Sequence, residues 1–182
     1  MLYPDVPPVF RHLREMKQLA RENSTAMKIS VGVLTNSDDR VPSVLSSLGL
    51  RVGSLRYGVG PERVNHASDG SELSDIDFVI LSYDVGFEKP SHEVFDAAKD
   101  LGRLGDVQSD LERCIHVGDD MDKDLEGAVL AGWEGLLLDR EGNHASRKPG
   151  IADSSMSSLV GLLRRIQEEP KSLKLWNHAI NS

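Results

Sequence analysis

The sequence predicts an α/β fold in which a parallel sheet is covered by helices on both faces. Short apolar runs rich in β-branched residues alternate along the chain with segments whose apolar residues recur every three to four positions. The apolar runs are nearly continuous and end in polar residues, as in strands that are buried on both faces. Repeated strand–helix–strand units of this kind are typical of a parallel sheet with crossover helices.

The first half of the chain is expected to contain two helices and two strands. Residues 9–22 place apolar side chains on one face of a helix, and residues 28–36, "KISVGVLTN", form the first strand. A helix follows up to Leu48, and Gly49 ends it. Three polar residues are candidates for its N-cap: Ser37, Asp38 and Asp39. Residues 77–82, "DFVILS", form the next strand.

The second half repeats the pattern. A helix is expected over residues 91–101, followed by a strand within residues 113–120, "RCIHVGDD". The small-residue segment 126–132, "EGAVLAG", forms the next helix, and residues 134–140, "EGLLLDR", form a further strand. A last amphipathic helix is expected over residues 155–167.

These elements predict one core domain over residues 1–169. A chain of 182 residues is long enough for one well-buried domain, and its length alone does not indicate two. Residues 58–75 are polar and rich in turn formers, so we expect a long surface loop or insertion there. Residues 170–182 are expected to form a C-terminal tail.

Composition excludes several classes of partner. The net charge of −8 argues against nucleic acid, because there is no basic excess to displace counterions from phosphates. A single cysteine, Cys114, excludes an internal disulfide and suits a reducing compartment. No apolar run approaches the roughly 20 residues of a membrane span, and the N-terminus lacks the features of a signal peptide. We therefore expect an intracellular protein, cytoplasmic or nuclear, whose partner is neither a membrane nor nucleic acid.

Chemically useful residues occur at three points where an apolar run ends. Thr35 and Asn36 follow the first strand, Lys89 lies in "GFEKP", and Asp119 and Asp124 follow the strand that begins near Ile115. Ligands of open α/β sheets bind at the carboxyl ends of the strands, so these residues should converge on one edge. A hydroxyl, an ammonium group and carboxylates at one edge predict a phosphate site.

Each residue type has a role in such a site. Thr35 and nearby backbone N–H groups can donate hydrogen bonds to phosphate oxygens. Lys89 supplies a positive charge against the phosphate. Asp119 offers a hard oxygen ligand for Mg²⁺, and Asp124 can orient the ion or its waters.

Each residue also has an ordinary reading when it is considered alone. Thr35 and Asn36 could be a strand-to-helix cap, Lys89 a surface lysine, and the acidic cluster a solvated loop that caps the next helix. Asp122 is expected to have only that capping role, and His116 is expected to be a strand residue with a satisfied ring. The joint order and placement of the motifs, not any single motif, favours the phosphate site.

This combination resembles the haloacid dehalogenase (HAD) superfamily. The segment "VGVLTN" looks like the second family motif, "GFEKP" like the third, and "HVGDDMDKD" like the fourth, and the likeness covers most of the chain. The resemblance implies a three-layer, Rossmann-like HAD core and Mg²⁺-dependent, phosphatase-type phosphoryl transfer on a small phosphorylated molecule. By the same resemblance, Thr35 and Asn36 bind the phosphoryl group, Lys89 steadies nucleophile and phosphate, Asp119 binds Mg²⁺ and Asp124 assists the metal site.

One family motif is missing. Members of the family open with Asp-x-Asp-x-Thr or Val, in which the first Asp attacks phosphorus. Asp5 has no apolar strand before it, and the acids of "DIDF", residues 75–78, precede an apolar run instead of following it. Without the nucleophile there is no covalent aspartyl-phosphate route, and one Mg²⁺ ligand is lost. We therefore expect an inactive chain in which Mg²⁺ binding is weak or lost.

Two explanations of this departure compete. We favour an N-terminally truncated enzyme, because the chain begins where the first strand and cap of a full-length member end; the alternative is a noncatalytic HAD-like binding or scaffold module. A response-regulator receiver domain is disfavoured, because its acidic strands come first and its lysine last, whereas the order here is Thr35, Lys89, Asp119.

The missing motif also has a structural consequence. In the family its strand is central and lies between the strands that end here at Thr35 and Asp119. Without it, these two strands must pair directly, at roughly 5 Å, or another segment must fill the position. Unpaired strand edges are costly and promote aggregation, so we expect marginal stability and poor solubility.

Overall fold

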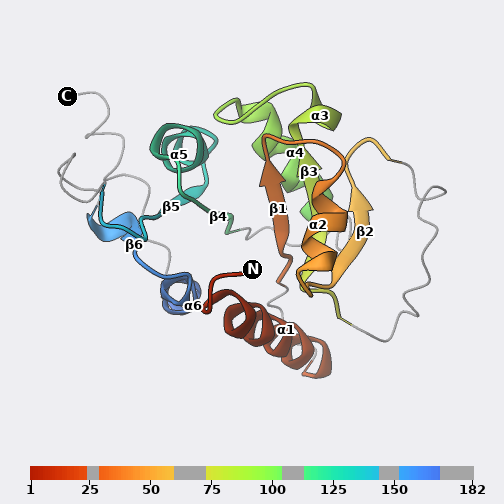
Figure 1. The fold of residues 1–182 in the computed structure, drawn as a ribbon, viewed down its shortest axis with the longest axis vertical. Helices are drawn as coiled ribbons and strands as arrows, with labels where there is room; N and C mark the ends of the chain where they lie inside the picture. Colours follow the sequence, from red (N-terminus) through yellow and green to blue (C-terminus); the bar gives the residue numbers. More distant parts are fainter. Residues whose placement is uncertain (24–28, 60–72, 104–112, 144–151, 169–182) are drawn as a thin grey trace. The chain divides into compact units, whose positions relative to one another are not determined.

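The computed structural model describes residues 1–23, 29–59, 73–103, 113–143 and 152–168 (Figure 1). The chain divides into two compact units, Met1–Glu112 and Arg113–Ser182. The predicted tail and most of the predicted insertion lie outside the described residues, and the single core over residues 1–169 stays a prediction.

The first unit contains a three-stranded parallel sheet, as the sequence predicts. Its strands are β1 (Gly32–Thr35), β2 (Val52–Arg56) and β3 (Ile76–Leu81). The order is β1-β3-β2, so β3 is central, and five of its six residues are buried. Thr35, the last residue of β1, lies opposite Leu81, the last residue of β3. The shared register brings the carboxyl ends of both strands to the same edge.

Helices cover both faces of this sheet. They are α1 (Val6–Glu22), α2 (Val41–Ser47), α3 (Ser82–Val85) and α4 (His92–Arg103). Val79 and Leu81 belong to a cluster to which α1 contributes Phe10 and α2 contributes two residues. Phe78 points to the opposite face, because side chains alternate along a strand. There its ring lies about 3.7 Å from the place of a Cβ at Gly102 of α4.

The elements differ from the predicted ones in ways that have local causes. The first helix begins at Val6, earlier than predicted, and prolines lie in its first turn. Proline has no backbone N–H, but the N–H groups of a first turn have no partner within the helix, so proline is tolerated there. The second helix has Arg40 as its N-cap instead of one of the three predicted residues, but the Asp38 carboxylate accepts from the Arg40 N–H at 3.1 Å. Strand β2 and the single turn α3 were not predicted.

A buried ion pair attaches α1 to the amino end of this sheet. The Lys17 side chain, 5% exposed, donates from Nζ to Asp77 Oδ2 at 2.6 Å and to the Ser74 carbonyl at 3.1 Å. The same Asp77 carboxylate accepts from Ser74 Oγ at 2.7 Å and from the Val31 N–H at 2.7 Å. Beside it, Asp75 accepts from the Arg51 N–H at 2.9 Å. The acids of "DIDF" are therefore structural and lie at the end of the sheet opposite Thr35.

The second unit contains a separate three-stranded parallel sheet of order β4-β5-β6. Its strands are β4 (Ile115–Gly118), β5 (Glu134–Leu138) and β6 (Ser155–Met156). Its helical segments are the π-helical turn η2 (Met121–Glu126), α5 (Gly127–Leu130), the 3-10 turn η3 (Ala152–Ser154) and α6 (Val160–Gln167). The predicted last helix was wrong in its first five residues, because Ser155 and Met156 pair with β5 instead. The helix starts only after this strand ends.

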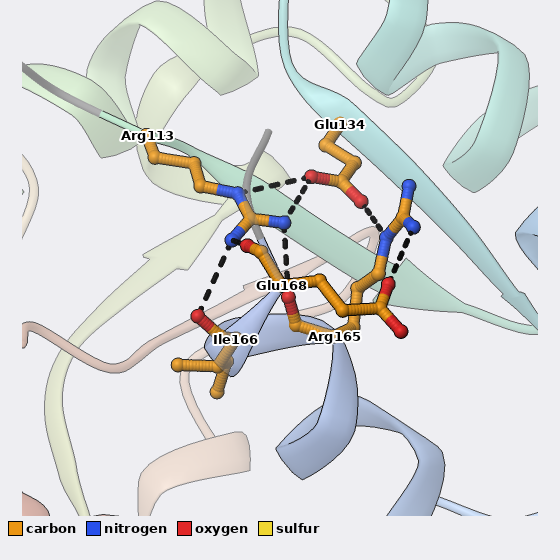
Figure 2. Close-up of polar contacts among 5 residues, drawn as sticks. All are labelled: Arg113, Glu134, Arg165, Ile166 and Glu168. Carbon is orange, nitrogen blue, oxygen red and sulfur yellow. Dashed lines mark hydrogen bonds and ion pairs between the residues drawn. The ribbon is translucent and has the colours of Figure 1, made fainter. Parts of the chain in front are cut away.

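A network of two arginines and two glutamates closes the amino end of this second sheet (Figure 2). Glu134, the first residue of β5, accepts from the guanidinium groups of Arg113, at 2.7 Å, and of Arg165. The Arg113 guanidinium also donates to the carbonyls of Ile166 and Glu168, at 3.3 and 2.7 Å, and so caps the end of α6. Partial burial disfavours the Arg165 cation, but its hydrogen bonds to Glu134 and Glu168 raise the pKa of this side chain. The network fixes the starts of β4 and β5 against α6.

Strands β1 and β4 are edge strands of their own sheets. In the described part of the chain, β1 pairs with β3 and β4 pairs with β5. The expected pairing of β1 with β4 joins strands of different units and stays a prediction. None of the helices within the described ranges is long and apolar enough to cross a lipid bilayer.

The Lys17–Asp77 ion pair gives a stability prediction. Replacing Lys17 by Met removes a buried charge and leaves Asp77 without its shortest partner. We expect Lys17→Met to lower the free energy of unfolding by about 1–3 kcal/mol, measured by urea denaturation. The matched control is Arg11→Met, which removes a positive charge from an exposed position of the same helix and should change stability by less than about 0.5 kcal/mol. Equal stability of the two variants would contradict this role of Lys17.

Candidate functional site

The structure brings Thr35, Asn36 and Lys89 together within the first unit. Thr35 ends β1, Asn36 follows it directly, and Lys89 lies in the loop between α3 and α4. The Asn36 side chain donates from Nδ2 to the Lys89 carbonyl at 3.1 Å and accepts from the Lys89 N–H at 2.8 Å. The Lys89 ammonium group donates to the carbonyl of Leu34 at 3.0 Å. Residues 53 positions apart are thus joined at the carboxyl end of β1.

These contacts divide the roles of the three residues. Both polar atoms of the Asn36 amide contact the backbone of residue 89, so Asn36 holds the lysine loop against the end of β1. The Lys89 ammonium group is a hydrogen-bond donor that binds the Leu34 carbonyl. Its charge is therefore held at the Leu34 carbonyl, next to the backbone of Thr35.

An open surface depression of about 570 Å³, called the cavity below, lies beside this junction. Its lining is almost entirely polar or glycine and consists of Asn36, Ser37, Asp38, Ser82, Tyr83, Gly86 and Glu88. It is wide open to solvent, so it would cover only one side of a bound molecule. The hydroxyl and carboxylate groups of the lining suit a polar molecule better than an apolar one.

Two arginine–carboxylate pairs lie near the rim of this cavity. The side-chain and backbone hydrogen bonds from Arg40 lower the pKa of Asp38, so this carboxylate is ionised at neutral pH. Arg56, at the end of β2, forms a two-pronged pair with Asp84 of α3, at 2.6 and 2.8 Å, and the hydrogen bond raises the pKa of Arg56. The pair ties α3 to the sheet and so supports one wall of the cavity.

The other two predicted site residues lie in the second unit and differ sharply in exposure. Asp119 follows β4 and its side chain is exposed. Asp124 is only 4% exposed, and both of its carboxylate oxygens accept hydrogen bonds from the protein. Oδ1 lies 3.0 Å from His116 Nε2, and Oδ2 accepts from the Asp120 N–H at 3.0 Å. Asp124 therefore faces inward, and Asp119 faces solvent.

Gly118 leaves the space that the Asp124 carboxylate fills. A Cβ atom at position 118 would lie 2.1 Å from Asp124 Cγ and 2.2 Å from Oδ2. Next to it, the Asp120 carboxylate accepts from the N–H groups of Asp122 and Lys123, at 3.0 and 2.9 Å, and caps η2. The capping residue is thus Asp120, whereas the sequence predicted a capping role for Asp122, which is exposed.

The described residues do not make up a Mg²⁺ site by themselves. They contain no group of three or more His, Cys, Asp or Glu side chains placed to hold a metal ion. Asp119 could supply one oxygen ligand, but the oxygens of Asp124 are already engaged with His116 and Asp120. With one protein carboxylate, the other positions of the Mg²⁺ octahedron would be left to water or to phosphate oxygens.

Sequence reasoning missed the linkage between His116 and Asp124. It expected a satisfied ring for His116 and did not identify the partner. The available signal was a histidine within an apolar strand, eight positions before an acid. A spacing of eight residues does not by itself show that the two side chains meet, because the conformation of the turn between them sets their distance.

Comparison with known proteins points to one family. Residues 86–153 match the family model described as HAD-hydrolase-like. An uncharacterised hydrolase of Schizosaccharomyces pombe is 32% identical over 124 residues, which are 68% of this chain and 45% of that protein. A glyceraldehyde 3-phosphate phosphatase of Methanothermobacter thermautotrophicus is 32% identical over 103 residues, which are 57% of this chain and 43% of that protein.

A solved structure has the same fold over almost the whole chain. The crystal structure of a HAD phosphatase from Thermococcus onnurineus superimposes with a TM-score of 0.60 at 21% identity and covers 93% of this chain and 60% of that protein. The chain spans less than half the length of the first three curated relatives that it matches.

The position of the Asp124 carboxylate gives a prediction for Gly118. Alanine at position 118 would push its Cβ into Asp124, so the carboxylate must leave its two partners. We expect Gly118→Ala to lower the free energy of unfolding by about 1–3 kcal/mol, measured by urea denaturation. Gly102→Ala is the control, because a Cβ there has ordinary contacts and alanine favours a helix by up to about 1 kcal/mol. A Gly118→Ala variant with unchanged stability would show that the Asp124 carboxylate lies elsewhere.

Proposed function

The chain belongs to the haloacid dehalogenase-like hydrolase superfamily, and from this premise we propose that it binds the phosphoryl group of a small phosphorylated molecule. The binding groups are the Thr35 hydroxyl, the backbone around Asn36 and the Lys89 ammonium group. The reaction class that this site serves is phosphatase-type hydrolysis. This chain lacks the nucleophile of that reaction, so we propose that it binds without turnover.

The observation that carries the proposal is the junction of Asn36 with Lys89. A phosphate dianion needs donors and positive charge that are already in place, because mobile groups would lose entropy on binding. The two hydrogen bonds of Asn36 fix the lysine backbone, and the bond to the Leu34 carbonyl directs the ammonium group toward the end of β1. This is an arrangement that favours an anion over a neutral ligand.

The cavity supports a small substrate. Its hydroxyl groups suit the uncharged, polar part of the molecule, whereas the carboxylates of Asp38 and Glu88 in the lining disfavour the phosphate itself there. The net charge of −8 opposes binding to nucleic acid, and we propose neither nucleic acid nor a membrane as a partner.

We propose Mg²⁺ as the cofactor of the reaction class, with Asp119 as the residue of this chain that would bind it. A bound Mg²⁺ would supply charge that neutralises phosphate oxygens. Asp124 serves the site indirectly, because its oxygens hold the loop that carries Asp119. The described residues give the ion too few ligands to bind it tightly.

The absence of turnover follows from the lack of an activated nucleophile. No Asp-x-Asp-x-Thr or Val segment follows an apolar run in the sequence. Asp38, the acid closest in sequence to Thr35 in the cavity lining, is engaged with Arg40. A hydroxyl needs an adjacent base to attack phosphorus, and the motif provides none for Thr35.

A noncatalytic HAD-like binding or scaffold module is the second candidate function. It is favoured by the same observation that opposes turnover: the phosphoryl-binding residues are organised, but the attacking carboxylate is missing. Adding that carboxylate should create activity if the chain is part of a phosphatase, and should create none if it is a noncatalytic module.

We expect Mg²⁺ to bind weakly. Titration calorimetry of the purified chain should give a dissociation constant no tighter than about 1 mM, equivalent to about −4 kcal/mol. The control is Asp119→Asn, which should remove whatever heat the wild type shows. Tight binding that is abolished by Asp119→Ala would show that the chain contains a complete metal site.

We expect the purified chain to lack hydrolysis of a generic aryl phosphate in the presence of Mg²⁺. The test adds an apolar strand that ends in Asp-x-Asp before Met1, and its matched control ends in Asn-x-Asn. Both additions should raise solubility and the unfolding temperature if the strand pairs with an exposed edge, and only the acidic version should create turnover.

Two outcomes would contradict the proposal. Mg²⁺-dependent hydrolysis by the unmodified chain, lost in both Thr35→Ala and Asp119→Ala, would show that the chain is a complete enzyme. Equal inactivity of both fusions, with improved stability, would favour the noncatalytic module.

A further inference from the structure

A buried histidine lies beneath the loop that presents Asp119. His116 is in the middle of β4, and its side chain is 8% exposed; the side chain of its partner Asp124 is 5% exposed. Their contact, 3.0 Å from Nε2 to Oδ1, joins the strand before the loop to the turn after it. The loop between them contains Gly118, Asp119 and Asp120.

The chemistry of the pair fixes which atom carries the proton. With Asp124 ionised, its carboxylate accepts hydrogen bonds and donates none, and Nε2 of His116 is then the donor in this contact. Asp124 Oδ1 then accepts from the ring, and Oδ2 accepts from the Asp120 N–H. Without the histidine, a buried carboxylate oxygen would lose its hydrogen bond, which is unfavourable.

The Asp124 carboxylate has little freedom to move. It fills the space beside Gly118, and its own backbone N–H donates to the Asp120 carbonyl at 2.9 Å. Asp120 is therefore held by Asp124 at two points, its N–H and its carbonyl. The residue directly before it is Asp119, so its backbone position follows from these contacts.

We propose that His116 is a positioning residue that acts through Asp124 to fix the backbone carrying Asp119. The ring orients the carboxylate, the carboxylate holds the Asp120 N–H, and the Asp119 side chain is thereby presented to solvent at the end of β4. Only the use made of Asp119 depends on the proposed function. The positioning itself is a property of the loop, so it can be tested without substrate or metal.

The experiment compares two replacements in the full chain by amide hydrogen exchange. His116→Leu keeps an apolar side chain of similar size in the strand and removes the donor. His116→Gln keeps an N–H donor that can reach the position of Nε2. A control for general loss of stability is Leu136→Val, a buried substitution in neighbouring β5 that removes no hydrogen-bonding group.

We expect His116→Leu to speed exchange of the Asp120 N–H by roughly tenfold or more relative to the amides of β5, because the carboxylate that accepts this hydrogen is no longer oriented. His116→Gln should restore protection to within about threefold of wild type. Leu136→Val should change Asp120 and β5 amides by the same factor.

Three results would overturn the proposal: an Asp120 amide that is unaffected by His116→Leu, a loss of protection that is uniform over the second unit, or a glutamine variant that behaves like leucine. If His116→Leu does not fold, His116→Asn takes its place, because its shorter amide does not reach Asp124 Oδ1. The asparagine variant must then lose Asp120 protection that the glutamine variant keeps.

Discussion

In each unit, one parallel strand pairing fixes where the edge strand ends: β3 pairs with β1 in the first unit, and β5 pairs with β4 in the second. Strand β3 holds β1 in a register that ends at Thr35 opposite Leu81, and β5 holds β4 in a register that ends at Gly118 opposite Leu137. A shift of one residue in either pairing would turn each apolar side chain of the edge strand to the wrong face. The register therefore fixes both the core and the residues that emerge at its carboxyl edge.

In each unit, charged side chains close the amino end of the sheet and leave the carboxyl end for function. Lys17 and Asp77 join α1 to the start of β3, and Glu134 joins Arg113 and Arg165 at the start of β5 (Figure 2). These pairs are partly or wholly buried, so their loss would leave unpaired charges. At the opposite end, the hydrogen bonds of Asn36 and Asp124 orient loops instead of joining helices to the sheet. The same types of polar residue thus serve stability at one end and positioning at the other.

The core strands and the convergence of Thr35, Asn36 and Lys89 could be predicted from the sequence. Long apolar runs and polar residues at their ends carry this information, because a parallel sheet brings those ends to one edge. Strand β2 could not be predicted, because "VGSLR" contains glycine and serine and two of its residues are exposed. Its pairing with β3 comes from tertiary contacts that propensity does not describe.

The difference in exposure between Asp119 and Asp124 could not be predicted from the sequence either. Both are acids in one polar loop, and acids are seldom buried. What decides the difference is the missing Cβ of Gly118 together with the ring of His116, and neither effect is visible until the backbone turns back on itself. The start of α6 was predicted too early for a similar reason, because the pairing of Met156 with Leu138 depends on β5.

The central claim is that the junction of Thr35, Asn36 and Lys89 binds a phosphoryl group. The most direct measurement is a titration of the ¹⁵N-labelled chain with inorganic phosphate, followed by amide chemical shifts. The account predicts saturable shifts of the amides of Thr35, Asn36 and Lys89, which are lost in Lys89→Ala and kept in the exposed-site control Arg11→Met. Shifts confined to other parts of the chain, or shifts at these amides that persist in Lys89→Ala, would contradict it.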